Sequence, residues 1–419
     1  MLARAEKPPV SHRASASRLM PGWPLSSRCR FHTRRAKTLC RTDLSAYVVP
    51  RPLSPAPRPH YNGHAGEPPA ALDIMEEDSA MLRRSFVVLV ASLAALWSAA
   101  GWAQVKEIPW GTSAVGSAGH KGLVVFAELL NREMPKYRIT VQPTPGAIVS
   151  VKGYATGQFE GYYGSDIAFY EMANDIKRFK GFKSNIKRQP LQSLWVFTTD
   201  MGIAVHVRDK DKYKSWHDLA GKALFTGMPP WDTRAQLERI FETLGIKYNY
   251  RQVDLSAAGS LLQSGRIDGF GLYTNGEASI PPWIAEASLT TDWAVVNPSA
   301  AEVAALKKAG FAVIEVKHEV FKRDIHADKA ILMPFYYGYH VGLDVPEADV
   351  YQMLKVVEKN AAELAKADAS FAQIAKDMAG FQRRGVESSV NLVPVHPGLA
   401  KYMREKGVWD AKWDARVAK

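Results

Sequence analysis

Cysteine is nearly absent from this chain of 419 residues: Cys29 and Cys40 are the only two, and none follows residue 103. The long remainder therefore cannot form a disulfide, a cysteine nucleophile, a thiolate zinc site or an iron–sulfur cluster. A cysteine-free chain also suits an oxidising compartment, because no free thiol is left to mispair.

Motifs of catalysis and of metal binding are also missing. The seven histidines beyond residue 103 form no His-x-x-x-His or His-Glu-x-x-His pair. The glycine-rich segment 111–122 has neither a Walker A ending nor Gly-x-Gly-x-x-Gly spacing, and Ser113 and Ser117 lie in no Gly-x-Ser-x-Gly elbow. We therefore expect a protein that is not an enzyme and needs no metal or cofactor.

A strongly basic folded part is absent, although the whole chain has a net charge of +12. Residues 1–103 hold 14 Lys and Arg against 7 Asp and Glu, whereas the remainder holds 40 against 35. A weak excess spread over the larger part gives no basic face, so no nucleic-acid partner is expected.

The first 103 residues differ from the rest of the chain in proline content, charge and apolar pattern. Residues 1–80 hold 11 of the 25 prolines and show no apolar periodicity, which predicts a disordered or mis-called upstream extension. Residues 81–103 combine two arginines, a 15-residue apolar run and small residues before Ala103, the layout of a signal peptide. The run is shorter than the ~20 residues of a membrane anchor, the rival interpretation. We expect cleavage after Ala103 and export to the periplasm.

Strand-like and helix-like segments alternate after residue 103, which predicts an α/β fold with mainly parallel strands in two sheets. No Pro/Gly-rich linker divides this part, so we expect strands to cross between two lobes. The apolar stretches assigned to the crossings are Leu194–Phe197 with Ile203–Val207, and Ile331–Tyr339. Lobe I is predicted to comprise 104–205 plus 331–419, and lobe II 206–330. A cleft between such lobes is the usual ligand site.

Two loops that precede predicted helices are candidates for binding an anion. Segment 111–117 and segment 228–234 each lead into a helix, whose first N–H groups are unpaired and carry the positive end of the helix dipole. In the second loop, Trp231 would cover an apolar part of a ligand and Arg234 would contact a carboxylate. The alternatives are a plain strand-to-helix turn and an arginine that is merely solvated.

A series of motifs in the same order resembles a known family. The series begins with Gly-Thr-Ser-x-x-Gly-Ser at 111–117 and Tyr-Gly-Ser-Asp at 163–166. Ser-Trp-His-Asp-Leu-Ala-Gly-Lys at 215–222, Gly-Arg-Ile-Asp-Gly at 265–269 and Val-Pro-Val-His-Pro-Gly at 393–398 follow. Together they resemble the TAXI branch of solute receptors that serve tripartite ATP-independent periplasmic (TRAP) transporters.

The resemblance implies a type II periplasmic-binding fold whose two lobes close over a small organic carboxylate and then dock on the membrane permease subunits of a TRAP transporter. The ligand-binding residues expected on this basis, with the two loops and nearby aromatic positions, are Thr112, Ser113, Ser117, His120, Tyr163, Ser165, Trp231, Asp232, Thr233, Arg234 and Tyr273. Segments 146–150 and 230–233 are bulkier and less polar than the family's pattern, which favours a more apolar or aromatic carboxylate.

Three alternatives to this function remain open. A receptor for an ABC-type importer and a receptor for a membrane sensor are not separated from the TRAP assignment by the sequence. An enzyme on the same fold is the third, and the relatives that share this architecture rely on a cysteine that is absent after residue 103.

Overall fold

A computed structural model describes residues 105–419. Its ten strands are β1 (Lys106–Gly111), β2 (Tyr137–Gln142), β3 (Gly161–Ser165), β4 (Trp195–His206), β5 (Ala223–Phe225), β6 (Asn249–Tyr250), β7 (Gly269–Asn275), β8 (Trp293–Val296), β9 (Ile314–Lys317) and β10 (Lys329–Val341). Its α-helices are α2 (Ala118–Glu133), α3 (Ala147–Thr156), α4 (Asp166–Ala173), α5 (Asp232–Leu244), α6 (Ala258–Gln263), α7 (Pro282–Thr290), α8 (Ala300–Lys308), α9 (Glu347–Lys359), α10 (Ala361–Ala367), α11 (Ala372–Lys376), α12 (Met378–Ser389) and α13 (Pro397–Glu405).

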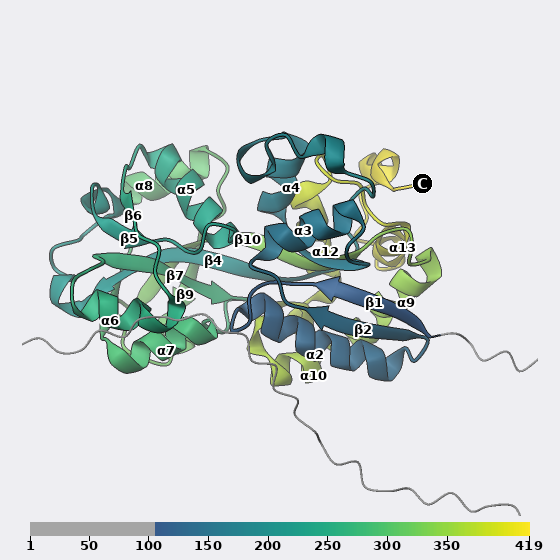
Figure 1. The fold of residues 1–419 in the computed structure, drawn as a ribbon, viewed down its shortest axis with the longest axis horizontal. Helices are drawn as coiled ribbons and strands as arrows, with labels where there is room; N and C mark the ends of the chain where they lie inside the picture. Colours follow the sequence, from purple (N-terminus) through teal and green to yellow (C-terminus); the bar gives the residue numbers. More distant parts are fainter. Residues whose placement is uncertain (1–104) are drawn as a thin grey trace, which may run out of the picture. The chain divides into compact units, whose positions relative to one another are not determined.

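The strands form one sheet in the order β2-β1-β3-β10-β4-β7-β5-β6, with β8 paired to β4 and β9 to β10. We call β1 to β3 with their helices the first half, and β5 to β9 with α5 to α8 the second half. The long strands β4 and β10 run antiparallel through both halves, and helices cover both faces of the sheet (Figure 1). The chain thus passes between the halves along strands rather than along a linker.

The predicted α/β fold class and its type II two-lobed arrangement are confirmed. Three details differ from expectation. The sheet is mixed rather than mainly parallel, because β4 and β10 pair antiparallel with each other and with β3, β7, β8 and β9. The structure has one continuous sheet in place of two, because β10 pairs with β3 of the first half, β4 pairs with β7 of the second, and β4 and β10 pair with each other. The stretches 194–197 and 203–207, expected as separate segments, are joined in β4 because the residues between them also pair. The predicted lobe boundaries remain a prediction.

Local sequence signals account for several element ends. Helix α5 ends at Leu244 and is followed by Gly245 with φ 70°, the left-handed conformation that glycine adopts without strain. Ser299 and Glu302 form the capping box that starts α8. The apolar repeat over 350–364 predicts one long helix, but the structure breaks it at Asn360 into α9 and α10. Asn360 leaves the helical conformation there, with φ −107° and ψ 14°.

The core fills the space on both faces of the sheet and includes aromatic side chains that are completely buried. Trp195 and Trp283 are among the buried aromatic residues. Among residues 105–419, no helix has both the length and the hydropathy needed to cross a bilayer. The predicted signal peptide at 81–103 lies outside the described residues.

Candidate functional site

A small cavity of about 30 Å³ lies where the two halves meet. Residues of the first half, the second half and the crossing strands line it: Ser113, Ser117, Ala118, Gly119, Ala147, Tyr163, Thr199, Trp231, Thr233, Tyr273, Asn275 and Tyr337. None of these side chains carries a formal charge at neutral pH. The polarity of the cavity therefore comes from hydroxyls, one amide and the backbone.

The N-terminus of α2 forms one wall of the cavity. Ser117 caps this helix by accepting a hydrogen bond from the backbone N–H of His120 at 3.2 Å. The first N–H groups of a helix have no partner within it, so those of Ala118 and Gly119 are available to a ligand. A side chain at Gly119 would lie 2.4 Å from the ring of Tyr163, so only glycine permits this close packing.

The N-termini of two further helices reach the same cavity. Helix α3 starts beside the cavity at Ala147, and its N-cap Gly146 offers no side-chain cap. Helix α5 starts after Trp231, which likewise provides no side-chain cap, so the first N–H groups of both helices are left for other partners. The indole Nε1 of Trp231 donates to the carbonyl oxygen of Pro145 at 3.2 Å, which joins the two halves directly.

Two buried polar atoms of the lining have no hydrogen-bond partner among the described residues: Oγ1 of Thr233 and Nδ2 of Asn275. The side chain of Asn275 is held in place because the Thr199 hydroxyl donates to its Oδ1 at 3.0 Å. A buried polar group without a partner destabilises the folded state, so these two atoms point to a ligand that would bond to them.

Three tyrosines supply much of the cavity's apolar surface. The rings of Tyr163 and Tyr337 stack at 4.2 Å between centroids with 12° between their planes. The hydroxyl of Tyr273 accepts from Nε1 of Trp283 at 2.9 Å and can still donate. Burial raises the pKa of all three phenols, so they stay neutral and can donate hydrogen bonds.

Six of the eleven residues predicted for the site line the cavity: Ser113, Ser117, Tyr163, Trp231, Thr233 and Tyr273. Four others lie behind it or at its edge. Thr112 donates to the carbonyl of Gly119 at 3.0 Å, and Ser165 donates to Asp232 at 2.6 Å. His120 contributes its backbone N–H to the cap of α2, and its side chain is absent from the lining.

Arg234 was expected to contact the ligand's carboxylate, but the structure places its side chain elsewhere. Its Nε donates to Glu238 at 2.7 Å, one turn along α5, and its guanidinium lies 3.7 Å from the centre of the Tyr250 ring. The Arg234 side chain does not point into the cavity, because Glu238 and Tyr250 both belong to the second half and neither lines the cavity. The expected contact between Arg234 and a ligand is not tested by this arrangement, and it would require the guanidinium to leave both Glu238 and Tyr250.

Six residues of the cavity lining were not expected from the sequence: Ala118, Gly119, Ala147, Thr199, Asn275 and Tyr337. Three of them begin helices α2 and α3, and side-chain chemistry gave no reason to single them out because they act through the backbone. Thr199 and Tyr337 belong to the crossing strands, and Asn275 ends β7. The polar residues within otherwise apolar crossing stretches were the one available signal.

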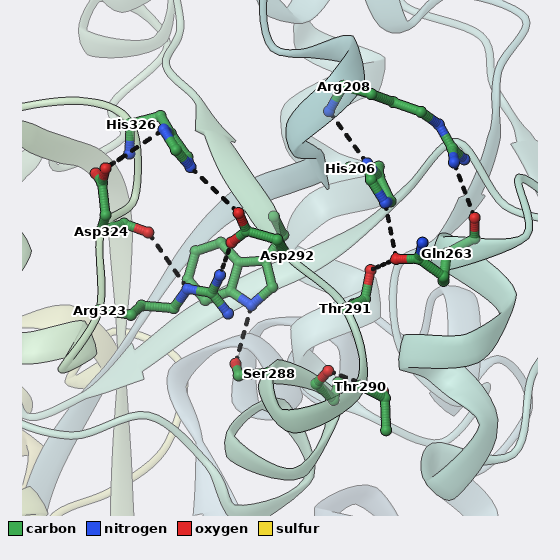
Figure 2. Close-up of polar contacts among 12 residues, drawn as sticks. His206, Arg208, Gln263, Ser288, Thr290, Thr291, Asp292, Arg323, Asp324 and His326 are labelled. Atoms are coloured by element: carbon green, nitrogen blue, oxygen red, sulfur yellow. Dashed lines mark hydrogen bonds and ion pairs between the residues drawn. The ribbon is translucent and has the colours of Figure 1, made fainter.

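Two histidines outside the cavity lining, His206 and His326, lie against polar or acidic neighbours. Figure 2 shows His206 bonded to Gln263 and to the backbone of Arg208, at 2.9 and 3.1 Å. It also shows His326 between the carboxylates of Asp292 and Asp324, at 3.7 and 3.4 Å. Among the described residues, no group of three or more His, Cys, Asp or Glu side chains is arranged to hold a metal ion.

Comparison with solved structures finds distant likenesses to binding proteins. The periplasmic aliphatic sulphonate binding protein of Escherichia coli is 14% identical, with TM-score 0.37 over 74% of this chain and 83% of that one. The alkanesulfonate-binding protein of Xanthomonas axonopodis pv. citri, bound to MOPS, is 15% identical, with TM-score 0.36 over 71% and 82%. A zinc-bound ligand binding component of an ABC-type import system from Staphylococcus aureus is 11% identical, with TM-score 0.37 over 73% and 93%.

At these scores the likenesses add nothing to the fold established from the strand order. A search of curated proteins found no significant match. The model of the NMT1-like family matches residues 111–407, which is well over half of the chain and includes every residue of the cavity lining. The chain therefore belongs to the NMT1-like family, a family of periplasmic solute-binding proteins.

Proposed function

We propose that this protein is an exported receptor that binds a small organic carboxylate between its two halves and delivers it to a membrane permease. The observation that carries the proposal is the meeting of three helix N-termini, those of α2, α3 and α5, at one cavity. Each N-terminus has the effect of about half a positive charge and offers unpaired N–H groups. Together they attract an anion without any cationic side chain in the lining.

The remaining lining groups indicate the rest of the ligand. The aromatic rings of Tyr163, Trp231 and Tyr337 offer flat apolar surface, and the unpartnered atoms of Thr233 and Asn275 can bond to a polar substituent or to the carboxylate itself. This combination supports a carboxylate with an apolar or aromatic body, for which the two halves must separate further, because a cavity of about 30 Å³ has the volume of about one water molecule. The residues that line the cavity include no histidine, carboxylate or lysine that could act as a general base on the hydroxyls of the lining, which supports binding without chemical conversion.

Delivery to a TRAP permease is proposed from the resemblance of the motifs, and the signal-peptide pattern at 81–103 supports a mature chain that begins at Gln104 and resides in the periplasm. An ABC-type importer is the second candidate because the NMT1-like family is related to the binding proteins of such importers. Uptake assays with the membrane subunits distinguish them: a TRAP system requires an ion gradient and no ATP, whereas an ABC system requires ATP.

Ligand binding is tested by thermal shift and calorimetry with acetate, pyruvate, benzoate and phenylacetate, each beside its uncharged amide. A carboxylate at a hundredfold excess over its Kd should stabilise the folded protein by about 2.7 kcal/mol. Mass spectrometry should recover the compound unchanged. Binding of the amides alone, or steady conversion of a bound compound, would contradict the proposal.

The matched variants Thr233→Val and Thr243→Val test whether the carboxylate binds at the cavity. Both lie on α5, but Thr233 lines the cavity, whereas Thr243 is exposed and bonds to the carbonyl of Arg239 at 2.8 Å. Thr233→Val should weaken carboxylate binding about tenfold, in line with the loss of one hydrogen bond to a charged group. Thr243→Val should leave it unchanged.

A further inference from the structure

Arg178 connects the two halves immediately behind the cavity. It lies in the 3₁₀ turn Lys177–Phe179 of the first half, and its Nη1 donates to Oδ1 of Asp232, the first residue of α5, at 2.6 Å. Its Nε donates to Glu171 of α4 at 2.8 Å. The side chain of Arg178 is 17% exposed and those of its partners 0% and 4%, so the three groups form a buried charged cluster.

Asp232 is the negative charge of this cluster that lies nearest to the proposed site. Its chain neighbours Trp231 and Thr233 both line the cavity. Both of its carboxylate oxygens are occupied, Oδ1 by Arg178 and Oδ2 by the hydroxyl of Ser165 at 2.6 Å. Its charge also reaches the lining: burial raises the pKa of Tyr163 and of Tyr337, and the negative charge of Asp232 raises both further.

A carboxylate beside an anion site repels the ligand unless a cation neutralises it. We propose that Arg178 is a positioning residue that offsets the charge of Asp232 and thereby allows the cavity to accept an anion. The inference rests on the proposed binding of a carboxylate. Arg178 acts through Asp232 and need not touch the ligand, which explains how the lining itself can lack a cation.

A neighbouring ion pair provides a matched control. Lys177 donates to Glu242 at 2.7 Å and therefore also joins the turn 177–179 to α5. The side chain of Lys177 is 51% exposed and that of Glu242 is 60% exposed, and neither residue lines the cavity. An exposed pair contributes little, so Lys177→Gln should leave anion binding unchanged even though it removes a contact between the halves.

The experiment measures binding of the tightest of the four carboxylates named above, and of its amide, to five variants by calorimetry. Arg178→Gln should weaken carboxylate binding at least about 30-fold, which corresponds to about 2 kcal/mol, and should change amide binding less than about threefold. Arg178→Lys keeps the charge and should stay within about tenfold of the wild type. Asp232→Asn should retain or tighten carboxylate binding, and adding it to Arg178→Gln should restore most of the lost affinity.

If Arg178 only holds the two halves together through its bond to Asp232, the five variants give a different pattern of affinities. It predicts that Asp232→Asn weakens binding, that the double variant is no better than Arg178→Gln, and that the amide is lost with the carboxylate; any of these results overturns the inference. Asp232→Asn and Arg178→Lys decide the matter even where Arg178→Gln does not fold. Failure of the wild type to bind any carboxylate instead rejects the proposed function, and with it this inference.

Discussion

Asn275→Asp places a carboxylate on the cavity wall with almost no change in shape. Asn275 is 1% exposed, its Oδ1 accepts from Thr199 at 3.0 Å, and its Nδ2 has no partner among the described residues. An aspartate can keep the bond from Thr199 and puts an acceptor where Nδ2 stood. The variant therefore tests the sign of charge that the cavity prefers.

The size of the effect follows from Coulomb's law. Two like charges about 5 Å apart at an effective dielectric constant of about 20 repel by about 3 kcal/mol, or roughly a 150-fold loss of affinity. The buried aspartate can also avoid the repulsion by binding a proton, so the loss should shrink as the pH falls. Calorimetry with a carboxylate and its amide, at neutral and acidic pH, measures both effects.

Asn185→Asp is the control, because Asn185 is exposed and does not line the cavity. It makes the same change of charge and should alter affinity less than about twofold. Our reasoning is refuted if Asn275→Asp binds the carboxylate as tightly as the wild type, or if the amide loses as much affinity as the carboxylate.

Three other changes have defined outcomes. Arg234→Ala should change affinity for a carboxylate less than about fivefold, because the Arg234 guanidinium contacts Tyr250 and Glu238. A hundredfold loss of affinity in calorimetry would show instead that Arg234 contacts the ligand. Gly146→Ala should hold the halves apart and weaken binding, because its methyl group would lie 2.7 Å from a backbone oxygen of the second half; small-angle scattering that shows no larger radius would contradict this. Burial raises the pKa of Asp200 from 3.8 to about 7, so its stabilising contribution is lost as pH rises from about 4 to 7. Asp200→Asn should therefore gain stability over the wild type across that window, by about 4 kcal/mol in chemical denaturation, and a difference independent of pH would count against the burial.

The sequence predicted the fold class, the crossing strands and half of the cavity lining for identifiable reasons. Apolar periodicity and caps such as Ser299 act over a few residues, so they can be recognised without knowing the fold. The loops 111–117 and 228–234 were predicted correctly as neighbours of the cavity because a helix N-terminus has the same chemistry wherever it lies.

The parts that the sequence did not predict depend on contacts between distant segments. The guanidinium of Arg234 lies over Tyr250, which belongs to another element, and Arg178 pairs with Asp232, 54 positions away in the chain. Whether β4 joins one sheet or two is likewise a matter of pairing between strands that are far apart in sequence. Local patterns give no information about these choices, although the spacing of Arg234 and Glu238, four residues apart on one helix, does indicate their ion pair.

The place of β10 in the sheet also determines the order in which the chain can fold. Residues 329–341 lie between β3 and β4, so β3 lacks one of its two neighbouring strands, and the halves lack a crossing strand, until most of the chain has been synthesised. Pairing over such a long sequence separation is slow, because the ends of a long loop must meet before any contact stabilises them. A nascent chain of this topology completes its sheet late, which is compatible with the proposed export of the chain in an unfolded state.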